Sequence, residues 1–283
     1  MSSSKASTMR QQRLGVELRR LRERAGLSST EAAKRLGGTP AQISNIEAGR
    51  YAVSAERVRT LAANYSCADR AYIDALAGMT GPRPRGWWEE YREILPAGLI
   101  DVAELEHSAT ALRASVMIHM PGLLQTAEYV RATAREDVPR PPAHLVEHRV
   151  SFRIKRQAVL FGDRPTPFTA IVHEAALRMG FGGPETARAQ LNYLVEMSER
   201  DHVSVLVIPF GEASFPASGQ PINYASGPAP QLDTVELDTE YGCDFMHAEA
   251  QLEKYRKVLD RLESRALKPG ESRDLIRRVA RDI

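Results

Sequence analysis

Apolar residues in the first 80 positions recur at the three- and four-residue spacing of helices. Leu14, Leu18, Leu21 and Ala25 form one such stripe, and arginines cover the opposite side of the same segment. Glycine and proline interrupt the spacing at short intervals, which divides the segment into several short helices. We therefore expect residues 1–80 to form a mainly α domain of five helices, with residues 1–8 as a polar arm.

Two of these expected helices begin with capping boxes. Ser28 precedes Glu31 by three residues, and Thr39 precedes Gln42 by three, with Pro40 at the first helical position. A Gly-Gly pair separates the two helices. Two helices joined by a tight glycine turn are typical of a helix-turn-helix, in which the second helix, here near 39–48, enters the major groove of DNA.

The pattern changes after residue 80. Residues 81–86 read Gly-Pro-Arg-Pro-Arg-Gly and predict an interdomain linker. The next segments predict an amphipathic helix that opens at Trp87-Trp88, then a helix from about Asp101 that extends to Leu112, and a strand over 115–119. Helices are expected over these ranges: 123–134, 143–160, 184–200, 248–266 and 272–282.

β-Branched and aromatic runs bounded by glycine and proline indicate strands in the second half. They are expected over these ranges: 167–174, 203–209, 222–225, 234–237 and 244–246. Residues 87–283 are therefore expected to form an α+β domain, with a mixed sheet and helices packed on one side of it.

Charge is unevenly distributed along the chain. The 283 residues include 38 Lys and Arg and 36 Asp and Glu, a net charge of +2, which excludes a histone-like tail or a uniformly basic nucleic-acid coat. Residues 1–66, however, contain twelve basic and five acidic side chains, whereas the rest contains 26 and 31. This distribution predicts that the N-terminal domain contacts a polyanion, although a solvated charged helix is the simpler alternative.

Cysteine content and hydropathy give further expectations. Cys67 and Cys243 are the two cysteines of the chain and lie far apart, so neither a disulfide framework nor a structural zinc site is expected. No metal and no cofactor is predicted. Apolar stretches such as 203–210 are much shorter than the roughly 20 residues of a membrane helix, so no membrane partner is expected and a cytoplasmic location is predicted.

The segment from Leu27 to Arg50 resembles the helix-turn-helix of the Cro/C1 repressor (Xre) family. The resemblance rests on Leu27-Ser28, Ala32-Ala33 and Ile43-Ser44-x-x-Glu47-x-Gly49-Arg50. It implies sequence-specific binding of double-stranded DNA. A homodimer is expected to bind an inverted-repeat operator, with the C-terminal domain supplying the contact that presents two half-sites. The DNA-contacting positions implied are Ser29, Thr39, Ala41, Gln42, Ser44, Asn45 and Arg50.

The chemistry of these side chains fits those positions. The amides of Gln42 and Asn45 can form bidentate contacts with adenine, and the hydroxyls of Ser44 and Thr39 can bond phosphates or base edges. Ser29 would meet a phosphate, and Arg50 would clamp the DNA backbone. The family commonly has Gln where Ser29 stands and polar residues where Pro40 and Ala41 stand, which predicts base readout that is either weaker or directed more to methyl groups. Glu47 is expected to bond within the domain.

The remainder of the chain also carries several motifs. They are Trp88-x-x-Tyr91, Leu105-Glu106-x-x-Ala109, Pro121-Gly122-Leu123-Leu124-Gln125-Thr126-x-x-Tyr129, Arg153-x-x-Arg156-Gln157, Glu174-x-x-Leu177-Arg178, Gln190-Leu191 and Val207-x-Pro209-Phe210. With them the chain resembles the C-terminal domain of uncharacterised function in actinomycete Xre-type regulators, the Scr1-antitoxin-like and WhiJ-like group. The resemblance implies a transcriptional regulator, in some cases encoded near a small partner protein.

Four aromatic residues of this domain are candidates for a groove that binds a ligand or partner: Trp87, Trp88, Tyr91 and Tyr129. The alternative is that they form core near the linker. Leucines and Tyr255 at heptad spacing within 252–266 could pair two chains, although packing on the sheet is the favoured interpretation.

The sequence thus predicts a DNA-binding transcriptional regulator whose C-terminal domain senses a partner protein or ligand, and not an enzyme. The first alternative is an antitoxin-like protein that sequesters a small partner and regulates its own expression. The second is an enzyme with a regulatory helix-turn-helix, for which His173 and Glu174 are the candidates. Their segment lacks the second histidine of a zinc-binding helix.

Overall fold

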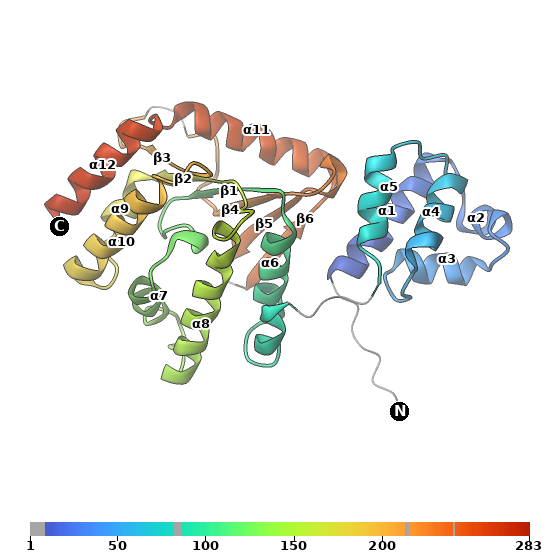
Figure 1. Cartoon of the computed structure of the whole chain (residues 1–283), viewed down its shortest axis with the longest axis horizontal. Coiled ribbons are helices and arrows are strands. Elements are labelled where there is room, and N and C mark those ends of the chain that lie inside the picture. Colours follow the sequence, from blue (N-terminus) through green and yellow to red (C-terminus); the bar gives the residue numbers. More distant parts are fainter. Residues whose placement is uncertain (1–8, 82–85, 213–214, 240) are drawn as a thin grey trace. The chain divides into compact units, whose positions relative to one another are not determined.

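The computed structural model describes residues 9–81, 86–212, 215–239 and 241–283 (Figure 1). The chain divides into two compact units, with the division between residues 85 and 86. The predicted polar arm, 1–8, and residues 82–85 of the predicted linker lie outside the described residues.

The described part of the N-terminal unit consists of five helices, as the sequence predicts. They are α1 (Met9–Arg24), α2 (Ser29–Arg35), α3 (Pro40–Glu47), α4 (Ala55–Asn64) and α5 (Arg70–Gly78). Leu18 of α1, Ile43 of α3, Leu61 of α4 and Leu76 of α5 are almost completely buried. These side chains bring four helices onto one small core.

Local capping chemistry sets where these helices begin. The side chains of Ser28 and Thr39 accept hydrogen bonds from the backbone N–H groups of Glu31 and Gln42, and the side chains of Glu31 and Gln42 bond back to the capping residues. Both predicted capping boxes are therefore confirmed. Each box satisfies backbone donors that the first turn of a helix leaves unpaired.

The C-terminal unit combines helices with one sheet. Its described α-helices are α6 (Ala97–Ser108), α7 (Ala127–Ala134), α8 (Ala143–Arg156), α9 (Glu174–Arg178), α10 (Gly183–Met197), α11 (Glu249–Arg265) and α12 (Pro269–Asp282). Short 3-10 helices are η1 (Trp87–Tyr91), η2 (Gly122–Leu124), η3 (Gln157–Leu160) and η4 (Pro230–Leu232).

Six strands are described, and they form a single mixed sheet. They are β1 (Ala111–Val116), β2 (Phe168–His173), β3 (Val203–Ile208), β4 (Ile222–Ser226), β5 (Thr234–Thr239) and β6 (Gly242–Met246). Their order across the sheet is β3-β2-β1-β4-β5-β6. The strands β1, β2 and β3 pair in parallel, whereas β4 is antiparallel to β1 and continues into an antiparallel ladder with β5 and β6. The predicted α+β class with a mixed sheet is confirmed.

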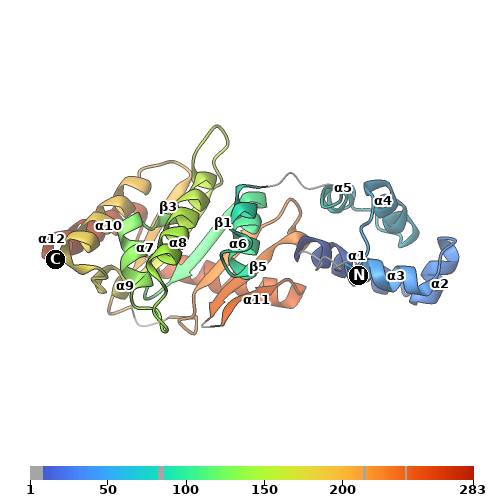
Figure 2. The same ribbon diagram turned by 90° about the horizontal axis from the view of Figure 1, so that it is seen from below.

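Helices cover both faces of this sheet, so the expectation that they pack on one side is wrong. Leu252, Leu259 and Leu262 of α11 pack with Ile171 and Val235 on one face. The other face packs against α10 and α12, and Figure 2 views the sheet from the side covered by α6, α7 and α8. Parallel strands need crossover connections, and here these connections are helical. The crossover helices cover a face of the sheet that could stay open to solvent in a purely antiparallel sheet.

Two boundaries also differ from the sequence prediction. The helix expected to include Leu112 ends at Ser108, and Leu112 lies in β1, which begins four residues before the expected strand. The amphipathic helix expected from Trp87 is one 3-10 segment that ends at Tyr91. Within the described residues, no helix is both long enough and apolar enough to span a bilayer.

Candidate nucleic-acid interface

The outer side of α3 is polar. Ala41, Gln42 and Ser44 are exposed and Asn45 is partly buried, whereas Ile43 on the inner side is buried. Because successive turns place these residues on one side of the helix, the amide and hydroxyl groups share a surface that faces away from the core. This surface contains four of the seven predicted DNA-contacting residues.

An ion pair between α1 and α3 holds this helix in place. Arg22 donates from Nε to Oε1 of Glu47 over 2.6 Å and from Nη2 to Oε2 over 2.8 Å, and its Nη1 donates to the carbonyl of Leu27. The two side chains are 10% and 8% exposed. The hydrogen bonds to Glu47 raise the pKa of Arg22. The prediction that Glu47 bonds within the domain is therefore confirmed.

Glycine allows α1 and α3 to approach each other closely. A Cβ atom at Gly15 of α1 would lie 2.4 Å from the carbonyl oxygen of Glu47 and 2.7 Å from that of Ile46. At Gly49, directly after α3, φ is +68° and a Cβ would lie 2.9 Å from the backbone of Gln11. Both positions therefore require a residue without a side chain, and the end of α3 is fixed against α1.

The capping box changes the predicted role of Gln42. Its Oε1 accepts the backbone N–H of Thr39 over 2.9 Å, while the Thr39 hydroxyl accepts the N–H of Gln42. A bidentate amide contact with adenine uses both Oε1 and Nε2. In the capped arrangement Nε2 remains available as a donor, which suits acceptors such as guanine O6, thymine O4 or a purine N7.

Asn45 and Arg50 lie together at the other end of α3. Nη1 of Arg50 donates to Oδ1 of Asn45 over 3.3 Å, and Arg50 itself is exposed. This hydrogen bond links a predicted base-reading residue to the predicted backbone clamp. It also orients the guanidinium along the exposed side of the helix.

Ser29 lies at the first position of α2, away from the cluster on α3. The neighbouring Glu31 carboxylate accepts hydrogen bonds from the backbone N–H and the hydroxyl of Ser28, which lower the pKa of Glu31. A negative charge therefore lies in the same first turn of α2 as Ser29, which disfavours a phosphate there. The contact between Ser29 and a phosphate stays a prediction.

Two groups of positive charges in this unit differ in their partners. Ion pairs engage five arginines: Arg13, Arg19, Arg20, Arg22 and Arg59. Four other cations make no ion pair with any described residue: Lys34, Arg35, Arg50 and Arg57. Nη2 of Arg57 lies 4.0 Å from the Cβ position of Gly38, just before the start of α3. Among the described residues, cations without an ion-pair partner therefore lie at both ends of α3. The one at Arg57 was not predicted from the sequence.

The aromatic residues of the predicted groove are core residues. Trp88 and Tyr91 are 3% and 4% exposed and pack with Phe152, beside the partly buried Trp87, whereas Tyr129 is buried in the main core of the sheet. The hydroxyl of Tyr91 bonds Ser151, and that of Tyr129 accepts the N–H of Met120. Because the rings are enclosed and divided between two clusters, they do not line a common groove.

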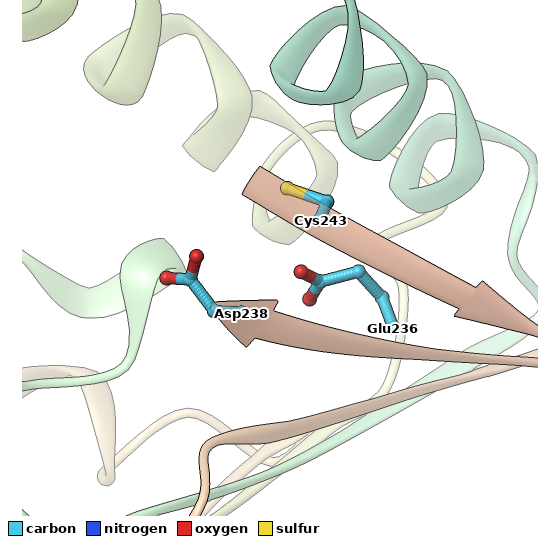
Figure 3. A group of neighbouring side chains, drawn as sticks. All are labelled: Glu236, Asp238 and Cys243. Carbon is cyan, nitrogen blue, oxygen red and sulfur yellow. The ribbon is translucent and has the colours of Figure 1, made fainter. Parts of the chain in front are cut away.

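Glu236, Asp238 and Cys243 form a group that the sequence analysis missed (Figure 3). Asp238 pairs with Cys243 across β5 and β6, and one potential ligand atom of each of the three residues lies within 4.8 Å of the others. Burial and the two carboxylates raise the pKa of the Cys243 thiol. The donor set suits a divalent cation, but a thiol that keeps its proton and the positive charge of nearby Arg156 oppose one.

His173 and Glu174, the candidates for an enzymatic site, have local structural contacts. Nδ1 of His173 accepts the backbone N–H of Ala175, and Glu174 accepts the N–H of Phe210 and pairs with Arg178. These contacts cap and anchor the short helix α9. The catalytic role of either residue stays a hypothesis.

Comparison with known families assigns both parts of the chain. Residues 13–76 match a family model described as a helix-turn-helix domain, and residues 99–278 match one described as a domain of unknown function (DUF5753). No curated protein and no solved structure matches the chain. The finer resemblances, to the Xre family and to the Scr1-antitoxin-like and WhiJ-like group, stay predictions.

Proposed function

The chain belongs to the DUF5753 family and carries a helix-turn-helix domain at its N-terminus, and we propose that it is a sequence-specific DNA-binding transcriptional regulator. The observation that carries the proposal is the polar outer side of α3, with Arg57 near its first turn and Arg50 after its last. A helix of this size fits the major groove, which is about 12 Å wide in B-DNA.

Each side chain of α3 then has a defined role. Asn45 and the Nε2 group of Gln42 read base edges, and the methyl group of Ala41 contacts a thymine methyl. Arg50 and Arg57 neutralise phosphates on either side of the groove. The Arg22–Glu47 ion pair fixes α3 relative to α1. The side chains that contact bases and those that contact phosphates therefore keep fixed positions relative to one another.

We further propose that the protein binds as a homodimer to an inverted repeat. The eight residues of α3 can contact a few base pairs, which is too little information to select one site in a genome. Two copies on half-sites one helical turn apart double the recognised sequence. The resemblance to the Xre family supports the same arrangement, and the C-terminal unit is the part that we expect to join the copies and to respond to a partner protein or a ligand.

The test is selection of binding sites from random duplex DNA with the full-length protein, followed by a salt titration on the selected site. The proposal predicts an enriched inverted repeat and an affinity that falls steeply as salt increases. Binding of the same strength to random DNA, with no enriched motif, would contradict sequence-specific recognition. Measurement of the mass of the complex on one selected duplex tests the dimer separately.

A further inference from the structure

Several motif residues of the C-terminal unit contact one loop, 120–126, which we call the Gly122 loop. Gln125 donates from Nε2 to the carbonyl of Met120 over 2.8 Å, and Gln157 donates from Nε2 to the carbonyl of Gln125 over 2.6 Å. Gln190 bonds the backbone of Leu124 and Thr126 with its two amide atoms. One bond within the loop and two segments outside it, those of Gln157 and Gln190, thereby fix the backbone of this loop.

The helix α8 carries arginines at positions 149, 153 and 156, and the last two lie beside this loop. Arg149 pairs with Asp137, and Arg156 forms a bidentate ion pair with Glu106. Arg153 makes no ion pair with any described residue; its Nη1 donates one hydrogen bond to Oε1 of Gln125 over 3.2 Å. A guanidinium has five N–H groups, so most of the donors of Arg153 have no hydrogen-bond partner among the described residues.

Gly122 lies beside the guanidinium groups of Arg153 and Arg156. A Cβ atom at Gly122 would lie 3.4 Å from Nη1 of Arg153, 3.4 Å from Nη2 of Arg156 and 3.6 Å from Nη1 of Arg156. Gly122 does not have the left-handed backbone that favours glycine, so its conformation does not explain the residue. The absence of a side chain at Gly122 therefore lets both guanidinium groups lie close to the backbone of the loop and to each other.

The local charge also favours a negative ligand. Burial, together with the positive charge of Arg156, lowers the pKa of Arg153 to about 10. The carboxylates of Asp238 and Glu106 act in the opposite direction, but within the described part of the chain neither forms an ion pair with Arg153. A cation that is partly removed from water without a counter-ion is costly, and an anion between the two guanidinium groups would remove that cost.

We propose that Arg153 and Arg156, at the Gly122 loop, bind the anionic group of a small molecule, either a carboxylate or a phosphate. Arg153 would use its free N–H groups and Arg156 the Nη1 group that Glu106 leaves unused. The partly buried position suits one oxyanion rather than the continuous backbone of a nucleic acid. The proposal goes beyond DNA binding and holds or fails independently of it.

Isothermal titration calorimetry with the full-length protein tests this site. Inorganic phosphate and succinate are the two probes, titrated at constant ionic strength with sodium chloride as the reference, so that the experiment separates a phosphate from a carboxylate site. We expect saturable binding of at least one probe. Arg153→Gln should weaken it about tenfold or more, because a charge-assisted hydrogen bond contributes about 1.5 to 3 kcal/mol.

Two further variants distinguish binding from folding. Gly122→Ala places a methyl group 3.4 Å from both guanidinium groups, where it narrows the space in which an anion can reach them, and should weaken binding while the circular dichroism spectrum stays unchanged. Asp238→Asn removes a repulsive charge and should tighten binding. Lys155→Gln is the matched control, since Lys155 lies on the same helix, pairs with Glu90 and should leave binding unchanged. Absence of saturable binding for both probes, or equal loss in Lys155→Gln and Arg153→Gln, would overturn the proposal.

Discussion

Replacement of Glu47 by Gln tests how α3 is held on the N-terminal unit. The neutral amide presents an N–H group to a guanidinium that also donates, and it leaves the charge of Arg22 without a partner. Breaking a buried ion pair from one side costs about 3 to 5 kcal/mol. Arg22 keeps its bond to Leu27 and lies 3.7 Å from the exposed Glu23, so the lower end of that range applies, about 3 kcal/mol.

Hydrogen exchange measured by mass spectrometry on the full-length protein reports this change locally. A loss of about 3 kcal/mol corresponds to amide exchange roughly a hundredfold faster in peptides of α1 and α3. Peptides from the sheet of the C-terminal unit serve as an internal reference and should not change. Glu23→Gln is the matched control, because the Arg19–Glu23 pair is exposed and contributes little.

The double variant Arg22→Leu with Glu47→Leu sharpens the test. It removes both charges and fills similar volume with apolar groups, so it should destabilise the unit less than Glu47→Gln alone. The reasoning is refuted if the α1 and α3 peptides of Glu47→Gln exchange as slowly as those of Glu23→Gln. It is also refuted if the double variant is less stable than both single variants.

Three other predictions follow from the contacts described. Gly15→Ala should lower the free energy of unfolding by about 1 to 3 kcal/mol in urea titrations, because its Cβ overlaps two carbonyl groups of α3; Gly78→Ala, with free space around it, should not. Burial raises the pKa of Tyr129 to about 12, whereas an unfolded tyrosine ionises near pH 10. The free energy of unfolding should therefore fall as the pH rises from about 10 to about 12, and it should fall less in Tyr129→Phe. An equal fall in both proteins would contradict this. Arg57→Ala should weaken binding to all DNA sequences similarly and reduce by about one the slope of log affinity against log salt concentration. Arg59→Ala should do neither, because Arg59 pairs with Asp74.

Local chemistry made the N-terminal unit predictable from the sequence. The capping boxes at Ser28 and Thr39 depend on residues three positions apart, so the sequence shows both partners of each bond. The partner of Glu47 was not visible, because Arg22 lies 25 residues away and meets it through the crossing of α1 and α3. Arg57 was missed for the same reason, since the tertiary fold brings α4 next to the turn before α3.

The C-terminal unit was less predictable where strands are buried on both faces. β1 lies between β2 and β4 and is buried on both faces. Its apolar run includes Leu112, which continues the helical spacing of apolar residues in α6. Periodicity therefore does not show where α6 ends and β1 begins. The alternation of Val235, Glu236 and Leu237 does indicate that Glu236 and Asp238 share one face. That Cys243 lies beside them depends on the pairing of β5 with β6.

The most direct test of DNA reading by α3 repeats the selection from random duplex DNA with two variants, Asn45→Ala and Arg50→Ala. If α3 reads bases, Asn45→Ala should lose preference at one position in each half-site and cost about 1 to 3 kcal/mol on the original site. Arg50→Ala should retain the motif and bind all sequences more weakly. An unchanged motif and an equal loss of affinity on every sequence for both variants would contradict the assignment of α3 as the recognition helix.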